Sequence, residues 1–319
     1  MMKCAFLFPG QGSQYVGMGK ALAEAFPIAR EVYEALDETL KQPLSKIMME
    51  GPVEALTLTQ NTQPALMTHS MALITVLEKE FNIDANHLVS MAAGHSLGEY
   101  SALCAANVFD FVTTVNLLRT RGSAMQNAVP VGQGAMAALI GVTIGQVQDL
   151  CKQATQGNSV VVVANDNGAS QVVVSGHMDA IERIIAIAKE AGIRRVVKLP
   201  VSAPFHSPLM EPAAREMRDA LAKTNPKPFN FPVIANITAC PYENSSSFVR
   251  DSLVRQITGS VRWAETMRYM IDQEVDFFVE VGAGKVLSKI MQRTARDSKV
   301  CSVDTPADLE EFAKILSAF

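Results

Sequence analysis

Hydrophobic residues along this chain form short continuous runs that alternate with longer stretches of helical spacing. The short runs lie at 3–8, 88–93, 232–238 and 276–281. Residues 63–80 instead carry apolar side chains three and four positions apart, which predicts a helix. Short buried strands between helices are typical of a largely parallel sheet. The pattern therefore predicts an α/β fold class.

The middle of the chain has a different order of elements. Its pattern predicts strand, helix, strand, strand, helix and strand over 134–142, 143–154, 158–166, 170–176, 177–192 and 193–201. This β-α-β-β-α-β order is that of the ferredoxin-like fold. Segments with Gly and Pro flank it at 129–134 and 200–208. We predict a small ferredoxin-like subdomain over 131–199, inserted into a large domain formed by 1–130 and 200–319.

Composition narrows the class of protein. The chain has 319 residues, 48% of them hydrophobic, enough to bury one large core or two modest ones. The net charge of −4 argues against a nucleic-acid partner. Five cysteines without a CxxC pair indicate a reducing compartment, and we expect no metal site. With neither a signal peptide nor 18 consecutive apolar residues, a soluble, cytoplasmic protein without a membrane partner is expected.

The segment Gly94-His95-Ser96-Leu97-Gly98 follows a predicted strand and precedes a helical run. GxSxG in this context is the nucleophile elbow, a sharp turn that exposes the serine hydroxyl. The unpaired N–H groups at the helix N-terminus, including that of Leu97, can bind an oxyanion. We predict that Ser96 is a nucleophile in an α/β-hydrolase-like domain with a short, mostly parallel sheet. A structural Gly-Ser turn is the alternative.

A serine hydroxyl needs a base to act as a nucleophile. His206 lies in a Pro-punctuated loop, LPVSAPFHSPLM, at the return from the predicted subdomain. Polar residues in such a loop at a domain junction are often functional, so His206 is a candidate base. An ordinary loop histidine is an equal alternative. His95 adjoins Ser96 and is expected to point elsewhere. The other histidines are expected to pack, to cap an element or to face solvent: His69, His87 and His177.

Six segments carry a resemblance to a known family. They are 8–14 (FPGQGSQ), 94–103 (GHSLGEYSAL), 119–130 (RTRGSAMQNAVP), 200–210 (PVSAPFHSPLM), 253–263 (LVRQITGSVRW) and 280–287 (EVGAGKVL). Together they resemble the malonyl-CoA:acyl-carrier-protein transacylases, acyltransferases of fatty acid and polyketide synthesis. The resemblance runs from residue 4 to about residue 300 and is far more specific than GxSxG alone.

The resemblance implies a ping-pong transfer of malonyl from malonyl-CoA to the phosphopantetheine thiol of acyl carrier protein, supplying extender units for fatty acid synthesis. It implies that Ser96 carries the malonyl group and that His206 is base and acid in both half-reactions. It places the oxyanion hole at the backbone amides of Gln11 and Leu97. It also implies that the backbone carbonyl of Gln256 orients His206.

Two arginines lie in the segment 119–130. Arg119 and Arg121 are two positions apart on a helical run, so they face different ways, and either could be a solvated surface residue. The resemblance assigns Arg121 to the free malonyl carboxylate. A guanidinium can bind a carboxylate through two parallel hydrogen bonds, which would select malonyl over acetyl.

Three further residues are candidates for the pocket. Asn165 either faces the active site or forms an ordinary Asx turn. Phe205 precedes the candidate base and would restrict the pocket to a small acyl group. His95 is included because it adjoins the nucleophile.

Four cations follow the Gly282-Ala283-Gly284 joint at helical spacing: Lys285, Lys289, Arg293 and Arg296. They predict one basic helix face, which could bind an acidic carrier protein; a solvated helix face is the alternative. The joint lacks the spacing of a phosphate-binding loop.

No bound cofactor is expected, since malonyl-CoA and the carrier's phosphopantetheine are substrates. A monomer with an acidic acyl carrier protein as partner is predicted. Two other functions stay open: a serine thioesterase that uses the same Ser96 and His206, and a non-catalytic module that docks carrier protein.

Overall fold

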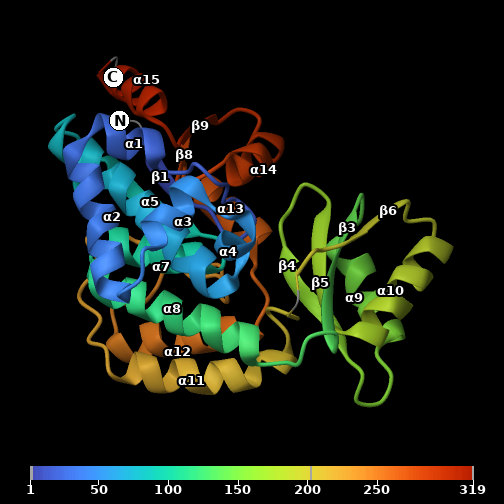
Figure 1. Ribbon diagram of the computed structural model, residues 1–319. Coiled ribbons are helices and arrows are strands. Elements are labelled where there is room, and N and C mark those ends of the chain that lie inside the picture. The colour runs from blue at the N-terminus through green and yellow to red at the C-terminus, as the bar shows by residue number, and fades with distance from the viewer. Residues whose placement is uncertain (1–2, 202, 318–319) are drawn as a thin grey trace.

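The computed structural model describes residues 3–201 and 203–317. Ser202, in the flanking segment expected at 200–208, lies outside the described residues. Figure 1 shows two separate sheets, one inside a large helical body and one beside it. An α/β fold with a second small sheet is what the sequence predicts, and this prediction is confirmed.

The larger sheet has five strands in the order β7-β2-β1-β8-β9, and all neighbours are parallel. Its strands are β1 (Cys4–Phe8), β2 (Val89–Gly94), β7 (Val233–Ile234), β8 (Phe277–Val281) and β9 (Lys299–Val303). Every residue of β1 and β8 is buried, because inner strands of a parallel sheet are covered on both faces. The parallel sheet was predicted, but its strand β9 was not.

The strand expected over 232–238 is mostly wrong. Only Val233–Ile234 form β7, because the chain folds back at once. The amide of Ala235 donates to the carbonyl of Cys240, and that of Tyr242 donates to the carbonyl of Val233. This reversal places Asn236 beside the carboxyl end of β2, where it contacts the Ser96 turn.

Helices cover both faces of the large sheet. Cys4, Phe6 and Phe8 of β1 pack into one apolar cluster and Ala5 and Leu7 into another, as alternation along a strand requires. The helices of this body are α1 (Lys20–Ala25), α2 (Pro27–Leu40), α3 (Leu44–Glu50), α4 (Val53–Thr57), α5 (Thr59–Lys79), α6 (Ala85–Leu88), α7 (Leu97–Ala105), α8 (Phe111–Asn127), the short 3₁₀ helix η1 (Pro208–Met210), α11 (Glu211–Ala222), α12 (Ser246–Thr258), α13 (Trp263–Asp272), α14 (Val286–Thr294) and α15 (Pro306–Ser317).

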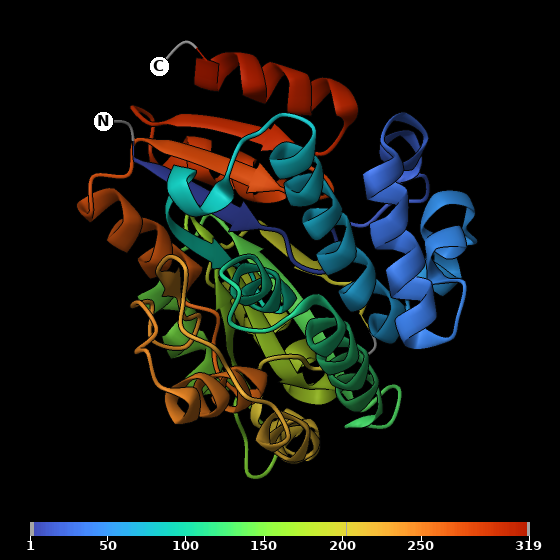
Figure 2. The ribbon, with the colours of Figure 1, turned by 90° about the vertical axis from the view of Figure 1, so that its left-hand side faces the viewer.

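Helix α5 runs through the middle of the large body and is buried along most of its length. It begins at Thr59, four residues before the helical run expected at 63–80. The last helix, α15, lies along the β9 edge of the sheet (Figure 2). Within the described residues, we find no helix with both the length and the apolar character needed to cross a membrane.

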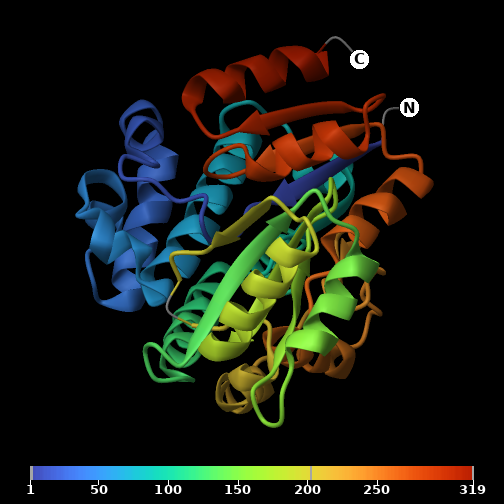
Figure 3. The same ribbon diagram turned by 90° about the vertical axis from the view of Figure 1, so that its right-hand side faces the viewer.

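The small sheet is antiparallel, with the order β4-β5-β3-β6. Its strands are β3 (Gly134–Ile140), β4 (Val161–Asp166), β5 (Gln171–His177) and β6 (Arg195–Lys198), and its helices are α9 (Ile144–Ala154) and α10 (Met178–Glu190). This is the strand order of the ferredoxin-like fold, as predicted. Figure 3 shows α9 and α10 on the outer face of the sheet. On the other face Met136 and Ala138 pack near Phe205, toward the large body.

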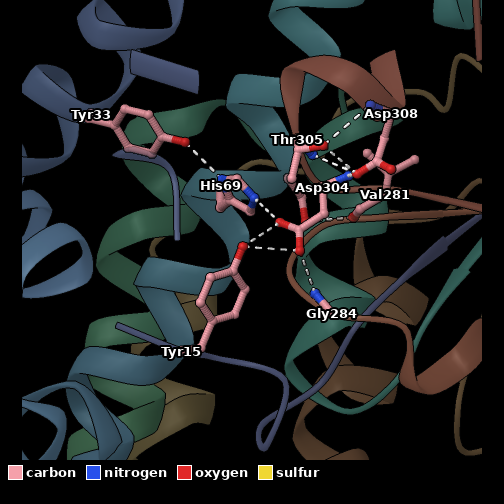
Figure 4. A network of polar contacts seen from close by, with 9 residues as sticks. Tyr15, Tyr33, His69, Val281, Gly284, Asp304, Thr305 and Asp308 are labelled. Atoms are coloured by element: carbon pink, nitrogen blue, oxygen red, sulfur yellow. Dashed lines mark hydrogen bonds and ion pairs between the residues drawn. The ribbon is translucent and has the colours of Figure 1, made fainter. Parts of the chain in front are cut away.

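A partly buried polar network joins three loops at the carboxyl edge of the large sheet (Figure 4). The carboxylate of Asp304, directly after β9, lies 2.8 Å from Nε2 of His69 on α5. It accepts hydrogen bonds from the hydroxyl of Tyr15, in the loop after β1, and from the amide of Gly284, after β8. Nδ1 of His69 contacts the hydroxyl of Tyr33 at 2.8 Å. His69 is therefore a packed histidine that helps to hold the strand ends together.

Candidate active site

The turn between β2 and α7 has the geometry of a nucleophile elbow. Ser96 lies between Gly94, the last residue of β2, and Leu97, the first of α7, with φ 55° and ψ −106°. A Cβ at Gly94 would lie 1.8 Å from the carbonyl oxygen of Gly98, and one at Gly98 would lie 2.2 Å from that of Phe8. Only glycine fits these two positions, so the GxSxG spacing follows directly from backbone contact.

Ser96 and His206 are hydrogen-bonded, although 110 positions separate them in the sequence. Ser96 Oγ lies 2.7 Å from His206 Nε2. His206 Nδ1 lies 2.9 Å from the carbonyl oxygen of Gln256 and 3.2 Å from that of Gly259. Because carbonyl oxygens only accept, Nδ1 carries the proton and Nε2 is free to accept the proton of Ser96.

The electrostatic surroundings keep His206 neutral. Burial lowers its pKa to about 3, and the nearby positive charge of Arg121 adds to this effect. Its hydrogen bonds to the two carbonyl oxygens act in the opposite direction. The imidazole is therefore in its basic form at neutral pH.

Arg121 is buried at the side of the nucleophile. Its Nη2 donates to Ser96 Oγ at 3.0 Å and to the side-chain oxygen of Gln256 at 2.8 Å. Its Nη1 donates to the side-chain oxygen of Gln63 at 2.8 Å, and the guanidinium carbon lies over the ring of Tyr100, 5.6 Å from the ring centre. Within the described residues, these acceptors are all neutral and Nε has no hydrogen-bond partner. The site therefore holds a buried cation without a contacting anion.

Arg119 faces the other way, as the two-residue spacing predicts. It donates to Asn61 at 2.7 Å and to Gln42 at 2.9 Å, where it links helices and loops of the large body. Arg121 can reach Ser96 because Gly122 allows α8 to approach α5 closely. A Cβ at Gly122 would lie 2.6 Å from the backbone of Gln60.

A cavity of about 120 Å³ opens above these groups. Besides Ser96, Arg121 and His206, it is lined by five other residues that the sequence singled out: Gln11, His95, Leu97, Asn165 and Phe205. Its remaining walls come from residues that sequence reasoning did not identify: Gln63, Met125, Met136, Leu199 and Val201. Leu97 is the first residue of α7, where a backbone amide has no partner within the helix.

Asn165 and His95 connect the small sheet to the elbow. Asn165 lies in strand β4 and pairs with Val261 of the large body, so the Asx-turn alternative is wrong. The turn comes later, at Asn167, whose side-chain oxygen lies 2.8 Å from His95 Nε2. The ring of His95 also packs against Trp263, and burial lowers its pKa. His95 thus points away from the Ser96 hydroxyl.

Three residues support the elbow from below and were not predicted as part of the site. Asn236 accepts a hydrogen bond from the amide of Ser96 at 2.8 Å and donates one to the carbonyl of Gly94 at 2.8 Å. Glu99, in the first turn of α7, is fully buried and accepts from the hydroxyl of Tyr242. Burial raises the pKa of Glu99 to about 7. Glu99 occurs within the segment 94–103, directly after the elbow, but its burial depends on distant segments.

The prediction that four cations form one basic helix face is wrong for two of them. Helix α14 covers only Val286–Thr294, so Lys285 precedes it and Arg296 lies beyond its end. All four cations are exposed. Lys285 and Lys289 also line a hollow that contains the carboxylates of Asp308 and Glu311. Within α14 only Lys289 and Arg293 remain from the predicted stripe.

The fold and the site are those expected of an acyltransferase, and comparison with known proteins agrees. The acyl transferase domain family matches residues 5–309, and the chain belongs to that family. A malonyl CoA-acyl carrier protein transacylase of Bacillus subtilis (strain 168) is 41% identical over 310 residues, which are 97% of this chain and 96% of that protein.

Solved structures of similar proteins cover the whole fold. The acyl-carrier-protein S-malonyltransferase from Bartonella henselae has a TM-score of 0.95 and 46% identity, over 99% of this chain and 100% of that one. A malonyl-transacylase solved in complex with its holo acyl-carrier protein, from a type II polyketide synthase, has a TM-score of 0.94 and 37% identity, over 98% and 99% of the two chains.

Proposed function

We propose that this protein transfers a malonyl group from malonyl-CoA to the phosphopantetheine thiol of an acidic acyl carrier protein, through a malonyl-serine intermediate, for fatty acid synthesis. Arg121 is the observation that carries the proposal. It is a buried guanidinium, 3.0 Å from the Ser96 oxygen, whose described acceptors are neutral. A buried cation of this kind favours a ligand that brings a carboxylate. The malonyl group has a free carboxylate, and its thioester carbon would then lie beside Ser96.

In the first half-reaction, Ser96 Oγ attacks the thioester carbon while its proton passes to His206 Nε2. The backbone amides of Gln11 and Leu97 stabilise the oxyanion of the tetrahedral intermediate. The carbonyl re-forms as the C–S bond breaks, and CoA leaves as a thiol that takes the proton from His206.

The second half-reaction reverses these steps with a different thiol. The phosphopantetheine thiol gives its proton to His206 and attacks the malonyl-serine carbon. The ester C–O bond breaks, and Ser96 Oγ recovers the proton. His206 is oriented by the Gln256 carbonyl rather than by a carboxylate; this suffices because a thioester is already activated.

The cavity walls support the transfer of a small acyl group. Phe205 limits its volume, while His95 and Asn165 close the side toward the small sheet. No bound cofactor takes part, because both thiols enter as substrates. Every group named above comes from one chain, which fits a monomer. We propose that residues 1–130 and 200–319 form the large domain and that 131–199 form the small subdomain. Residues from both line the cavity.

The carrier protein is proposed to contact Lys289 and Arg293 of α14. Both are exposed, and α14 begins at the carboxyl edge of the sheet, the edge that also carries Ser96. Positive side chains there favour an acidic partner.

Intact mass after brief mixing with malonyl-CoA or acetyl-CoA tests the proposed function. We expect a malonyl adduct that is absent in Ser96→Ala, that forms slowly in His206→Ala, and that holo acyl carrier protein discharges. Arg121→Ala should lower malonyl transfer relative to acetyl transfer by about 100-fold, as expected when a charge-assisted bidentate contact is lost.

Two outcomes would contradict the proposal. An adduct that water removes as fast as carrier protein does would make the protein a thioesterase. A lack of adduct from either donor would leave carrier-protein docking, or transfer of a different acyl group, as its function.

A further inference from the structure

Glu99 is a fully buried carboxylate three residues after the nucleophile, and the mechanism above does not use it. Its Oε1 accepts from the Tyr242 hydroxyl and from the backbone amide of Asn236, at 3.2 Å for the latter. Its Oε2 accepts from the side-chain amide of Gln256 at 2.6 Å. Donors from α12 and from the chain reversal after β7 therefore surround both carboxylate oxygens.

The side-chain amide of Gln256 contacts both Glu99 and Arg121. Its Nε2 donates to Glu99 and, at 2.8 Å, to the carbonyl oxygen of Ser96. The carbonyl oxygen can only accept, and so can the Glu99 carboxylate when it is ionised. The other end of the amide, Oε1, must then face outward, where it accepts from Arg121 Nη2 at 2.8 Å. Above about pH 7, where Glu99 is ionised, one side chain thus connects a buried anion to a buried cation.

The arrangement keeps the two charges apart by the length of one amide. A carboxylate in direct contact with Arg121 would occupy the hydrogen-bond donors that a substrate carboxylate needs. A carboxylate held behind Gln256 still lies close enough to stabilise the guanidinium in its buried position, where attraction between charges is strong. Glu99 can therefore balance the charge of Arg121 without competing for its ligand.

We propose that Glu99 is a positioning residue for acyl selectivity: it fixes the side-chain amide of Gln256, and thereby holds Arg121 in the orientation that binds an acyl carboxylate. This rests on the proposed function, in which Arg121 binds the malonyl carboxylate. Glu99 does not touch the acyl group and acts only through Gln256.

Glu99→Gln is the informative substitution, because it keeps shape and replaces one acceptor with an NH₂ group. Each carboxylate oxygen now faces a donor, so the new NH₂ meets a donor wherever it points. The conflict is relieved by moving Gln256 or Asn236. We expect the ratio of kcat/KM for malonyl-CoA to that for acetyl-CoA, measured as formation of the acyl-enzyme at about pH 8, to fall about tenfold.

Tyr242→Phe is the matched control. It removes the hydroxyl that donates to Glu99 Oε1, on the side away from Gln256. Because this hydrogen bond lowers the pKa of Glu99, the control is measured at about pH 9 as well as at about pH 8, so that the carboxylate stays ionised and the Gln256 and Arg121 contacts stay in place. We expect lower stability with an unchanged malonyl-to-acetyl ratio. If Glu99→Gln also leaves the malonyl-to-acetyl ratio unchanged, the role of Glu99 is structural and the proposal is overturned.

A second variant covers the case in which Glu99→Gln does not fold. Gln256→Met removes the connecting amide and keeps the backbone carbonyl that holds His206, so the malonyl-to-acetyl ratio should fall as well. A normal ratio in this variant would overturn the proposal.

Arg121→Ala separates the proposed function from this inference. A normal ratio in Arg121→Ala would contradict the binding of malonyl by Arg121. A lowered ratio in Arg121→Ala together with a normal ratio in Glu99→Gln would contradict only the role of Glu99.

Discussion

Ser96 and His206 face each other from two unusual backbone positions, with φ of 55° and 57°. Residues other than glycine rarely adopt the left-handed region, and such strain is commonly found at functional sites. At Ser96 the contacts around Gly94 and Gly98 impose the conformation. At His206 it directs the ring between Ser96 and the carbonyls of Gln256 and Gly259.

The pH dependence of stability should show the burial of His206. Its pKa falls from 6.5 to about 3 on folding. Between these two pH values, His206 is protonated in the unfolded chain and neutral in the folded chain. This contribution to stability is present above pH 6.5 and is lost as the pH falls toward 3. Between pH 7 and pH 5, wild type should lose about 2 kcal/mol more of its unfolding free energy than His206→Asn does.

Urea unfolding at the two pH values measures this difference. Asparagine is a suitable replacement because it tolerates positive φ and does not titrate. An equal loss of stability in both proteins would mean that His206 titrates normally in the folded state.

At the scale of elements, the site is built where parallel strands end. Ser96 follows β2, Gln11 follows β1, Gly284 follows β8 and Asp304 follows β9, all at one edge of the sheet. In parallel α/β sheets this edge is where ligands bind. The Asp304 network of Figure 4 connects three of these four loops, including the loop that carries Gln11.

Asp304→Asn should destabilise the protein by about 1–2 kcal/mol, because the new NH₂ group must face a donor on one of its sides, and two of the three donors, His69 and Gly284, lie in part-buried contacts. Asp297→Asn is the matched control, since Asp297 is exposed in the turn before β9 and its replacement should change stability by less than about 0.5 kcal/mol. Urea unfolding of both variants checks this. Equal stability of the two variants would show that the network contributes little.

For the whole molecule, the question is how a chain of net charge −4 would bind the proposed acidic carrier protein. Local charge decides this, because salt screens distant charges beyond about 10 Å. Helix α14 presents Lys289 and Arg293 at the surface, while the hollow beside it includes carboxylates. The surface available to a carrier protein is thus smaller than the sequence predicts.

Replacing Lys289 and Arg293 with Glu should raise the apparent KM for acyl carrier protein about tenfold and leave the KM for malonyl-CoA unchanged, since charge reversal acts on a charged partner at close range. Steady-state transfer assays measure both constants. Lys223→Glu with Lys227→Glu makes the same change in net charge after α11 and should have little effect. An unchanged KM for carrier protein in the α14 variant would exclude this helix as its contact.

The sequence by itself determined the features that depend on near neighbours. Turn chemistry at 94–98, the periodicity of helices and strands, and the order of elements in 134–198 are local properties, so they predicted the elbow and both sheets. The resemblance to a family, carried by longer motifs, singled out Arg121 and gave a role to His206, which its Pro-punctuated loop had already made a candidate. A local pattern could not predict that Glu99 is buried, since its partners Asn236 and Tyr242 are 137 and 143 positions away.

Only the tertiary structure decided which residues meet. The fold brings His206 to Ser96, places Asn236 under the turn, and joins Glu99 to Arg121 through Gln256. It also ended α14 at Thr294, which removed Arg296 from the predicted helix face. The physical reason is that burial and hydrogen bonding depend on packing between segments distant in sequence, whereas periodicity records only which side of an element is apolar.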